Sequence, residues 1–325
     1  MFKILIMVVA FLFSSPAISS QLNIVVSSIP GGGADLQARV IAKHLSKYLP
    51  NNQNVNVINM QGGGGLIAAN WLYNVADQQS NISILTVNND VIVKGLIKDE
   101  NAKYDLTKFK WLFSAEDGSD NVFVLWANSK RGLKSIQDMR QENIFVIGNQ
   151  GPNNIQSYIL QEIVGVKSKI VFGYKDIIRA LQINEIDARF GTLMNTKARF
   201  PSWLTGENEI RPILQVGSFN RHPLLNSVPN AREFSKTENH KIILDYYEKT
   251  VRLSRLVFAP PNMSESRVQE ILKASYSLET DKEFIEDANK VEMDVDFIRF
   301  EETNSIMKDI LSTNVDLLKS IVSKN

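Results

Sequence analysis

The sequence predicts an α/β fold in which mostly parallel sheets are flanked by helices. Short β-branched runs alternate with amphipathic helical patterns along most of the chain, an alternation typical of βαβ units. The two clearest units lie near the start, where strands over 23–28 and 55–58 each lead through a glycine cluster into a helix. Because neither a repeat nor a low-complexity linker divides the chain, we expect two lobes joined by crossing strands.

Residues 1–20 have the features of a cleaved export signal. Lys3 supplies the positive start, residues 4–13 an apolar core, and residues 16–20 small side chains, with cleavage expected near Ser19 or Ser20. The apolar core is shorter than the ~20 residues of a membrane span. We therefore expect export to the periplasm, without stable membrane insertion of the mature chain.

Composition excludes several classes of function. The chain has 36 basic and 35 acidic residues and no cysteine. A balanced charge without a basic block argues against nucleic acid as a partner. The lack of cysteine excludes disulfides, thiolate metal sites and cysteine nucleophiles.

The elements follow from periodicity and from the residues that end them. Apolar residues at helical spacing predict a helix over 35–49, and Pro50 follows its end. The strands expected are 23–28, 55–58, 82–87, 123–126, 144–147, 169–172, 188–190 and 213–216. The helices expected are 35–49, 66–75, a stretch through 97, 135–140, 155–164, 176–183, 265–277, 282–290 and 301–323.

The domain boundaries follow from this order of elements. Residues 21–123 together with 236–325 are expected to form the first lobe, and residues 124–235 the second. The first lobe is then discontinuous in sequence, because the chain leaves it and returns.

The glycine clusters at 31–33 and 62–65 allow three chemical interpretations. Neither has the third glycine of a dinucleotide-binding motif, and neither has the lysine of a P-loop. The third interpretation is a carboxylate held by bare backbone N–H groups at two helix N-termini. Tight turns that need positive φ remain the plain alternative for either cluster alone. Two clusters in the same strand-to-helix context favour the anion site.

Asparagines follow the predicted strands 82–87 and 144–147, at the strand ends where open α/β sheets bind ligands. Asparagine is also a common turn residue, so each one alone indicates little. The residues that we expect to bind the ligand are Gly31, Gly32, Gly33, Ala34, Gly62, Gly63, Gly64, Gly65, Leu66, Asn88, Asn89, Asn149, Gln150, Gly151, Asn153, Asn154 and Thr192.

Catalysis is not indicated. Asp35 is interpreted as a first-turn acid that supports its helix and pairs with Arg39. The three histidines, His44, His222 and His240, have no metal-binding or triad spacing; we interpret the first as a half-buried packing residue and the others as surface residues. We therefore expect no enzyme activity, no metal and no cofactor.

Motifs in the same order and spacing mark a family resemblance along essentially the whole mature chain. They are residues 30–35 (PGGGAD) with Ala38-Arg39, residues 59–65 (NMQGGGG), 148–152 (GNQGP), 173–174, 184–187, 222–229 and 258–261. In these the chain resembles the substrate-binding receptors of tripartite tricarboxylate transporters, the Bug or TctC-like proteins. Asn149 and Gln150 stand where that family has two serines, and amide side chains suit a hydroxyl or amide beside the carboxylate.

The resemblance implies a two-lobed periplasmic-binding-protein fold, type II-like, with the ligand in the cleft between the lobes. It also implies a small organic carboxylate as ligand and the membrane permease subunits of a tripartite tricarboxylate-type transporter as partner. Three alternatives stay open: a ligand sensor that signals to a membrane kinase, an exported enzyme that uses Asp35 or Asp90 in the same cleft, and an interaction module with an empty cleft.

Overall fold

The computed structural model describes residues 21–76, 82–86, 90–118, 122–140, 144–149, 154–174, 176–291 and 293–322. The predicted signal peptide at 1–20, with its cleavage site, lies outside the described residues. Five predicted site residues lie outside them as well: Asn88, Asn89, Gln150, Gly151 and Asn153.

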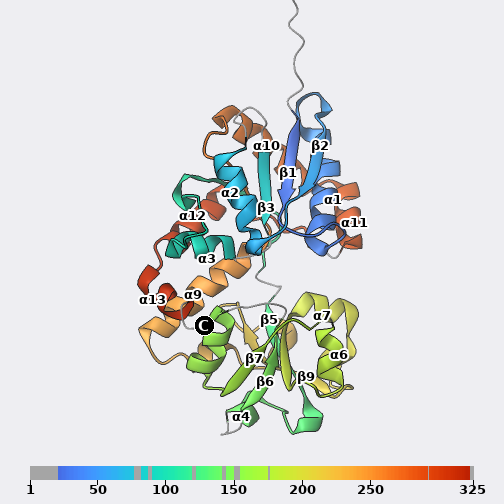
Figure 1. Ribbon diagram of the computed structural model, residues 1–325. Coiled ribbons are helices and arrows are strands. Elements are labelled where there is room, and N and C mark those ends of the chain that lie inside the picture. The colour runs from blue at the N-terminus through green and yellow to red at the C-terminus, as the bar shows by residue number, and fades with distance from the viewer. Residues whose placement is uncertain are drawn as a thin grey trace, which may run out of the picture.

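Two five-stranded sheets form the centres of two lobes (Figure 1). The first has the order β2 (Val55–Asn59), β1 (Leu22–Val26), β3 (Ile82–Thr86), β10 (Leu256–Ala259) and β4 (Lys110–Ser114). The second has the order β7 (Ser168–Val171), β6 (Phe145–Gly148), β8 (Ala188–Thr192), β5 (Phe123–Asn128) and β9 (Ile210–Val216).

In each sheet the fourth strand in this order runs against the other four. β10 is antiparallel to β3 and β4, and β5 is antiparallel to β8 and β9, whereas the remaining pairs are parallel. These two reversed strands are the first ones that the chain forms after crossing from one lobe to the other. The predicted α/β fold with mostly parallel sheets in two lobes is confirmed.

Thirteen α-helices are present in the described part of the chain. They are α1 (Gly33–Tyr48), α2 (Leu66–Asn74), α3 (Asp90–Ile97), α4 (Ile136–Met139), α5 (Asn154–Tyr158), α6 (Ile177–Gln182), α7 (Leu193–Arg199), α8 (Ser202–Thr205), α9 (Glu238–Arg252), α10 (Glu265–Leu278), α11 (Lys282–Lys290), α12 (Phe300–Leu311) and α13 (Val315–Val322).

Two predicted helices differ from the structure, and three helices were not predicted. The helix expected over 155–164 is α-helical only to Tyr158 and continues as a π-helix, Ile159–Val164. The helix expected over 301–323 breaks after Leu311, and its second part is α13. Helices α7, α8 and α9 were not expected, although Thr237 caps α9 by accepting a hydrogen bond from the backbone N–H of His240.

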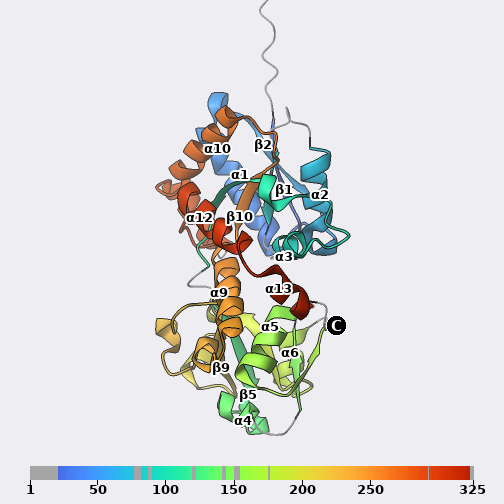
Figure 2. The same cartoon turned by 90° about the vertical axis from the view of Figure 1, so that its left-hand side faces the viewer.

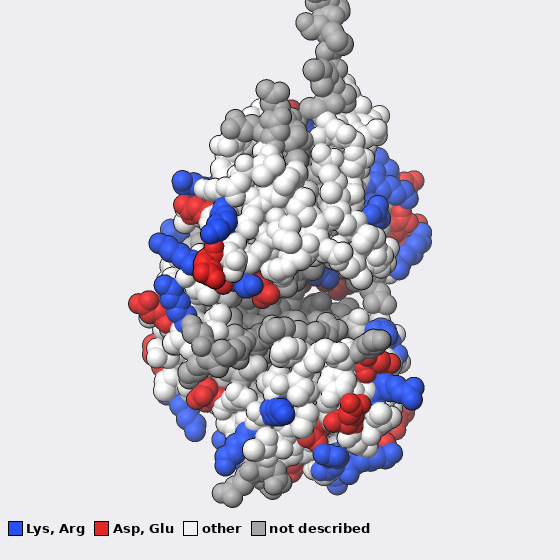
Figure 3. Space-filling model, in the orientation of Figure 1, with Lys and Arg blue, Asp and Glu red and all other residues white. Residues whose placement is uncertain are grey.

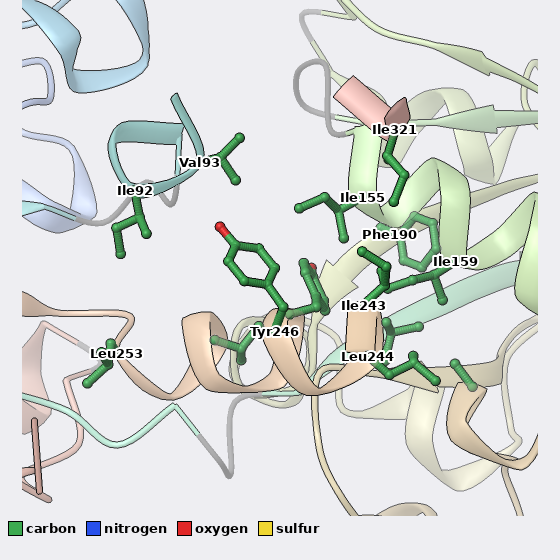
Figure 4. Packing of buried hydrophobic residues seen from close by; sticks show 14 of the residues in the cluster. Ile92, Val93, Ile155, Ile159, Phe190, Ile243, Leu244, Tyr246, Leu253 and Ile321 are labelled. Carbon is green, nitrogen blue, oxygen red and sulfur yellow. The ribbon is translucent and has the colours of Figure 1, made fainter. Parts of the chain in front are cut away.

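A single buried apolar cluster extends across both lobes. It includes Val93 from α3 in the first lobe, Ile155 from α5 in the second, and Tyr246 and Ile321 from α9 and α13 (Figure 4). Figure 2 shows α9 and α13 at the level where the two lobes meet, and α13 packs against both α3 and α5. The two lobes are therefore held together by packing. No described strand runs from one sheet into the other, so the expected crossing strands are not found; the chain returns to the first lobe through α9 (Glu238–Arg252).

Candidate functional site

The first glycine loop is organised by one buried carboxylate. Asp35 is 1% exposed and accepts hydrogen bonds from the backbone N–H of Gly31 (2.8 Å), from Nε of Arg39 (2.9 Å) and from Nδ2 of Asn59 (2.8 Å). The hydrogen bond from Arg39 is the main reason that the pKa of Asp35 falls from 3.8 to about 2; the bonds from Gly31 and Asn59 also lower it, and burial opposes them. The carboxylate stays charged and supports the loop, as the sequence predicted.

Two of the N–H groups in this loop are already used within it. That of Gly31 donates to Asp35, and that of Gly32 donates to the carbonyl of Ile29 at 3.2 Å. The N–H groups of Gly33 and Ala34 belong to the first turn of α1, where a helix offers no internal acceptor. They are the donors of this loop that remain for an anion, and they lie at the positive end of the helix.

The second glycine loop has an unusual backbone. Gly62, Gly63, Gly64 and Gly65 all have positive φ, from 58° to 124°, which only glycine adopts readily. The loop closes on itself through the N–H of Gly65 to the carbonyl of Gly62 and that of Leu66 to the carbonyl of Gly63. Turn geometry therefore explains the glycines, and the closure leaves the N–H groups of Gly62, Gly63 and Gly64 as this loop's candidate donors.

An acidic side chain packs directly against this loop. A Cβ added at Gly64 would lie 2.5 Å from Oδ2 of Asp90, the first residue of α3. Glycine is thus required at this position both by its φ of 65° and by the close approach of Asp90. The contact fixes the second loop to the start of α3.

The structure brings the two loops together at one edge of the first sheet. Strands β1 and β2 are parallel neighbours, so their carboxyl ends meet there. The N–H of Met60 donates to the carbonyl of Val26 at 2.8 Å, and Nδ2 of Asn59 donates to the carbonyl of Ser28 at 3.2 Å. The two predicted halves of the anion site are therefore adjacent.

Ser27 is a site candidate that the sequence analysis did not identify. Its hydroxyl lies 3.4 Å from the position of a Cβ at Gly65, and it is buried without a hydrogen-bond partner in the described part of the chain. Buried hydroxyls are normally satisfied, so this one is a candidate contact for a ligand beside the glycine loops. Its place immediately after β1 was the signal that could have identified it.

The carboxyl edges of the two sheets both lie at the crossover between the lobes. Thr192, at the end of β8, pairs with Phe123, where the chain enters the second sheet. Thr86, at the end of β3, pairs with Leu256, where the chain re-enters the first. Figure 1 shows the two lobes one above the other, and Figure 3 shows the surface hollowed between them.

In the second lobe, three predicted site residues lie at the carboxyl edge of the sheet. Asn149 follows β6, and its Nδ2 donates to Oε1 of Gln156 at 3.1 Å; Gln156 in turn donates to the hydroxyl of Tyr247 in α9 at 2.5 Å. Asn154 is the first residue of α5, and Thr192 is the last of β8. The orientation of Asn149 is thus coupled to the helix between the lobes.

One group of side chains has the composition of a metal site, but it lies elsewhere. Ligand atoms of His44, Asp281 and Glu283 lie within 4.8 Å of one another between α1 and α11. The ammonium of Lys47 already contacts Glu283 at 2.6 Å and Asp281 at 3.4 Å, so a cation occupies the position between the two acids. His44 is fully buried, not half-buried as predicted, because its ring packs edge-on against Phe284.

A pocket of about 610 Å³ opens elsewhere on the second lobe. It is lined by residues that include Lys134 and Arg211, and Arg211 lies near the amino end of β9. That end of the sheet is opposite the edge that carries Asn149 and Thr192. Within the described residues, no helix is both long and apolar enough to cross a bilayer.

Comparison with known proteins gives a consistent answer for the fold. No protein-family model and no curated protein sequence matches the chain. Among solved structures, a TctC solute-binding protein from Polaromonas superposes with a TM-score of 0.67 at 15% identity, covering 94% of this chain and 98% of its own.

Two further structures from Rhodopseudomonas palustris were solved with ligands. Rpa4515 with adipate superposes with a TM-score of 0.64 at 17% identity, covering 93% of this chain and 96% of its own. MatC with bound malate superposes with a TM-score of 0.59 at 16% identity, covering 92% of this chain and 98% of its own. The chain therefore has the two-lobed fold of the TctC-type periplasmic solute-binding proteins, as the motif resemblance implied.

Proposed function

We propose that this protein is an exported solute-binding receptor that captures a small organic carboxylate between its lobes. In this proposal it delivers the ligand to the permease of a tripartite tricarboxylate-type transporter. The observation that carries the proposal is the convergence of two glycine loops, with their helix N-termini, at the edge of the first sheet that adjoins the second lobe. The similar structures with malate and adipate support the same class of ligand.

The anion is held in the first lobe by main-chain donors. The N–H groups of Gly33, Ala34, Gly62, Gly63 and Gly64 and the hydroxyl of Ser27 supply up to six hydrogen bonds. Charge-assisted bonds of this kind contribute about 1.5–3 kcal/mol each, before the cost of association is subtracted. A few of them are enough for micromolar affinity, which corresponds to about 8 kcal/mol.

Closure of the second lobe completes the site. Asn149 and Thr192 lie at the edge of the second sheet that faces the crossover, so they contact a ligand bound to the first lobe only when the lobes approach. A ligand that contacts both lobes only in the closed form shifts the equilibrium toward that form. The closed form is then the one that the permease recognises.

The chemistry available at the loops does not favour an enzyme. Asp35 is held as a carboxylate by Arg39, with a pKa of about 2, so it cannot serve as a general base near neutral pH. The carboxylate of Asp90, the other candidate for a catalytic base, is packed against Gly64. Binding without turnover is therefore the function proposed.

The first experiment is a thermal-shift screen of residues 21–325 against mono-, di- and tricarboxylic acids. A ligand at ~100 times its dissociation constant stabilises by ~2.7 kcal/mol, which raises the melting temperature of a chain of this size by about 4 °C. Hits are then measured by calorimetry. Absence of binding to every acid in the screen contradicts the proposal.

Gly33 allows a sharp test of the main-chain donors. Its predecessor Gly32 is extended, with φ −72° and ψ 160°, which is the conformation that a residue before proline prefers. Proline is also favoured at the first position of a helix, and a Cβ at Gly33 meets no atom within 4 Å. Gly33→Pro therefore removes one N–H without disturbing the fold.

We expect Gly33→Pro to weaken binding of the best acid by about tenfold or more. Gly33→Ala keeps the N–H and serves as the matched control, with affinity close to that of the wild type. Equal affinity of the two variants would show that this N–H does not contact the ligand.

A further inference from the structure

Arg189 is a buried cation without an acidic partner in the described part of the chain. It is the second residue of β8 and is 6% exposed, and its Nε donates a hydrogen bond to the carbonyl of Phe190 at 3.1 Å. Burial, with a smaller contribution from Arg199, lowers the pKa of Arg189 to about 10. The guanidinium is therefore still charged at neutral pH.

An unpaired buried charge is costly, because the desolvation of the ion is not compensated. The other buried arginine, Arg267, pairs with Glu270 at 2.7 Å. Arg189 instead has another cation, Arg199, as its electrostatic neighbour. An anionic ligand that binds the guanidinium of Arg189 would compensate this buried charge.

The guanidinium extends toward the edge of the sheet where the ligand is expected. A Cβ at Gly191 would lie 2.7 Å from a terminal nitrogen of Arg189 and 3.1 Å from Cζ. The side chain therefore runs along β8 toward Thr192, through space that only a glycine at 191 leaves open. In the neighbouring strand, Arg189 pairs with Gly148, the residue before Asn149.

We infer that Arg189 is the specificity-determining contact of the second lobe and that it binds a carboxylate of the ligand. This inference rests on the proposed function. The first lobe holds one acidic group with main-chain donors, and Arg189 holds a second acidic group from the opposite side of the cleft. The geometry thus selects ligands that are acidic at both ends, namely dicarboxylates.

The test compares acids that differ only in the second carboxylate. The pairs are malate with 2-hydroxybutyrate and adipate with hexanoate, each titrated calorimetrically into the wild type, Arg189→Met and Arg189→Lys. We expect the wild type to prefer the diacid. Arg189→Met loses about ten- to a hundredfold in affinity for the diacid and little for the monoacid, whereas Arg189→Lys keeps the charge and loses less.

The matched control is Arg211→Met, the same change at an exposed arginine near the opposite end of the sheet. It is expected to bind like the wild type. Melting temperatures without ligand separate binding from structure: removal of an uncompensated buried charge leaves Arg189→Met as stable as the wild type or more stable.

Each outcome decides the question. If the wild type binds a diacid and Arg189→Met binds it equally well, the role of Arg189 is refuted while the proposed function stands. If the wild type binds none of the four acids or any other carboxylate, both fail together. If Arg189→Met does not fold, Gly191→Ala, which displaces the guanidinium, takes its place, and unchanged affinity in that variant overturns the inference.

Discussion

The substitution Asp35→Asn tests how the first glycine loop is held in place. The carboxylate accepts hydrogen bonds from the N–H of Gly31, from Arg39 and from Asn59. An asparagine amide has a single acceptor oxygen and an NH2 group, so at least one of these donors is left facing another donor. The turn at Gly31 then loses its main support.

The magnitude follows from the pKa of Asp35. A fall from 3.8 to about 2 corresponds to roughly 2.5 kcal/mol of stabilisation of the charged form, at about 1.36 kcal/mol for each pKa unit. The side chain of Arg39 is 50% exposed, and solvent screens exposed ion pairs. We therefore expect Asp35→Asn to lower the free energy of unfolding at pH 7 by about 2 kcal/mol.

The stabilisation that Asp35 provides decreases as the pH falls. Because the folded-state pKa of Asp35 lies below the unfolded value, its contribution is complete above about pH 5 and is lost as the pH falls toward 2. Below that range the wild-type side chain is protonated and, like asparagine, neutral. The difference in stability between wild type and Asp35→Asn should therefore shrink as the pH falls.

Urea unfolding at pH 7, 5, 3.5 and 2.5 measures this difference. Glu207→Gln, at an exposed loop position, is the control for loss of one negative charge. A difference that stays constant over the whole pH range, or that Glu207→Gln reproduces, would refute the reasoning. The same variant is also expected to bind the screening acids more weakly, because the loop that presents Gly33 and Ala34 is no longer fixed.

Two further substitutions probe the surroundings of the site. Gly64→Ala is expected to lower the free energy of unfolding by about 1–3 kcal/mol, because it forces alanine into φ 65° and against Asp90. The control Gly33→Ala is neutral or slightly stabilising. Equal stability of the two variants in urea would contradict this prediction. Tyr246→Phe is expected to leave the free energy of unfolding unchanged or to raise it by about 1 kcal/mol. The reason is that the hydroxyl of Tyr246 is buried without a partner in the described residues, and burial keeps its pKa high. A loss above about 1 kcal/mol in urea unfolding would reveal a partner.

Local patterns predicted much of the fold. β1 and α1 were predicted because a β-branched run, a glycine turn and an apolar helical spacing follow one another within 30 residues. By contrast, β4 and β10 were not predicted, because Lys110–Ser114 and Leu256–Ala259 are short apolar runs without the alternation of apolar and polar residues that marks a half-buried strand. They become strands by pairing with each other and, for β10, with β3, across more than 100 residues of sequence.

The candidate site also has some features that the sequence predicts and others that only the tertiary structure determines. The sequence by itself determined the two glycine loops and the helices that follow them, because glycine at positive φ and a helix start are local properties. Only the tertiary structure decided which N–H groups remain as donors, that Ser27 lacks a partner, and that Arg189 lies buried toward Thr192. These features depend on which strands are neighbours and on what each side chain meets after packing, and no short-range pattern encodes that.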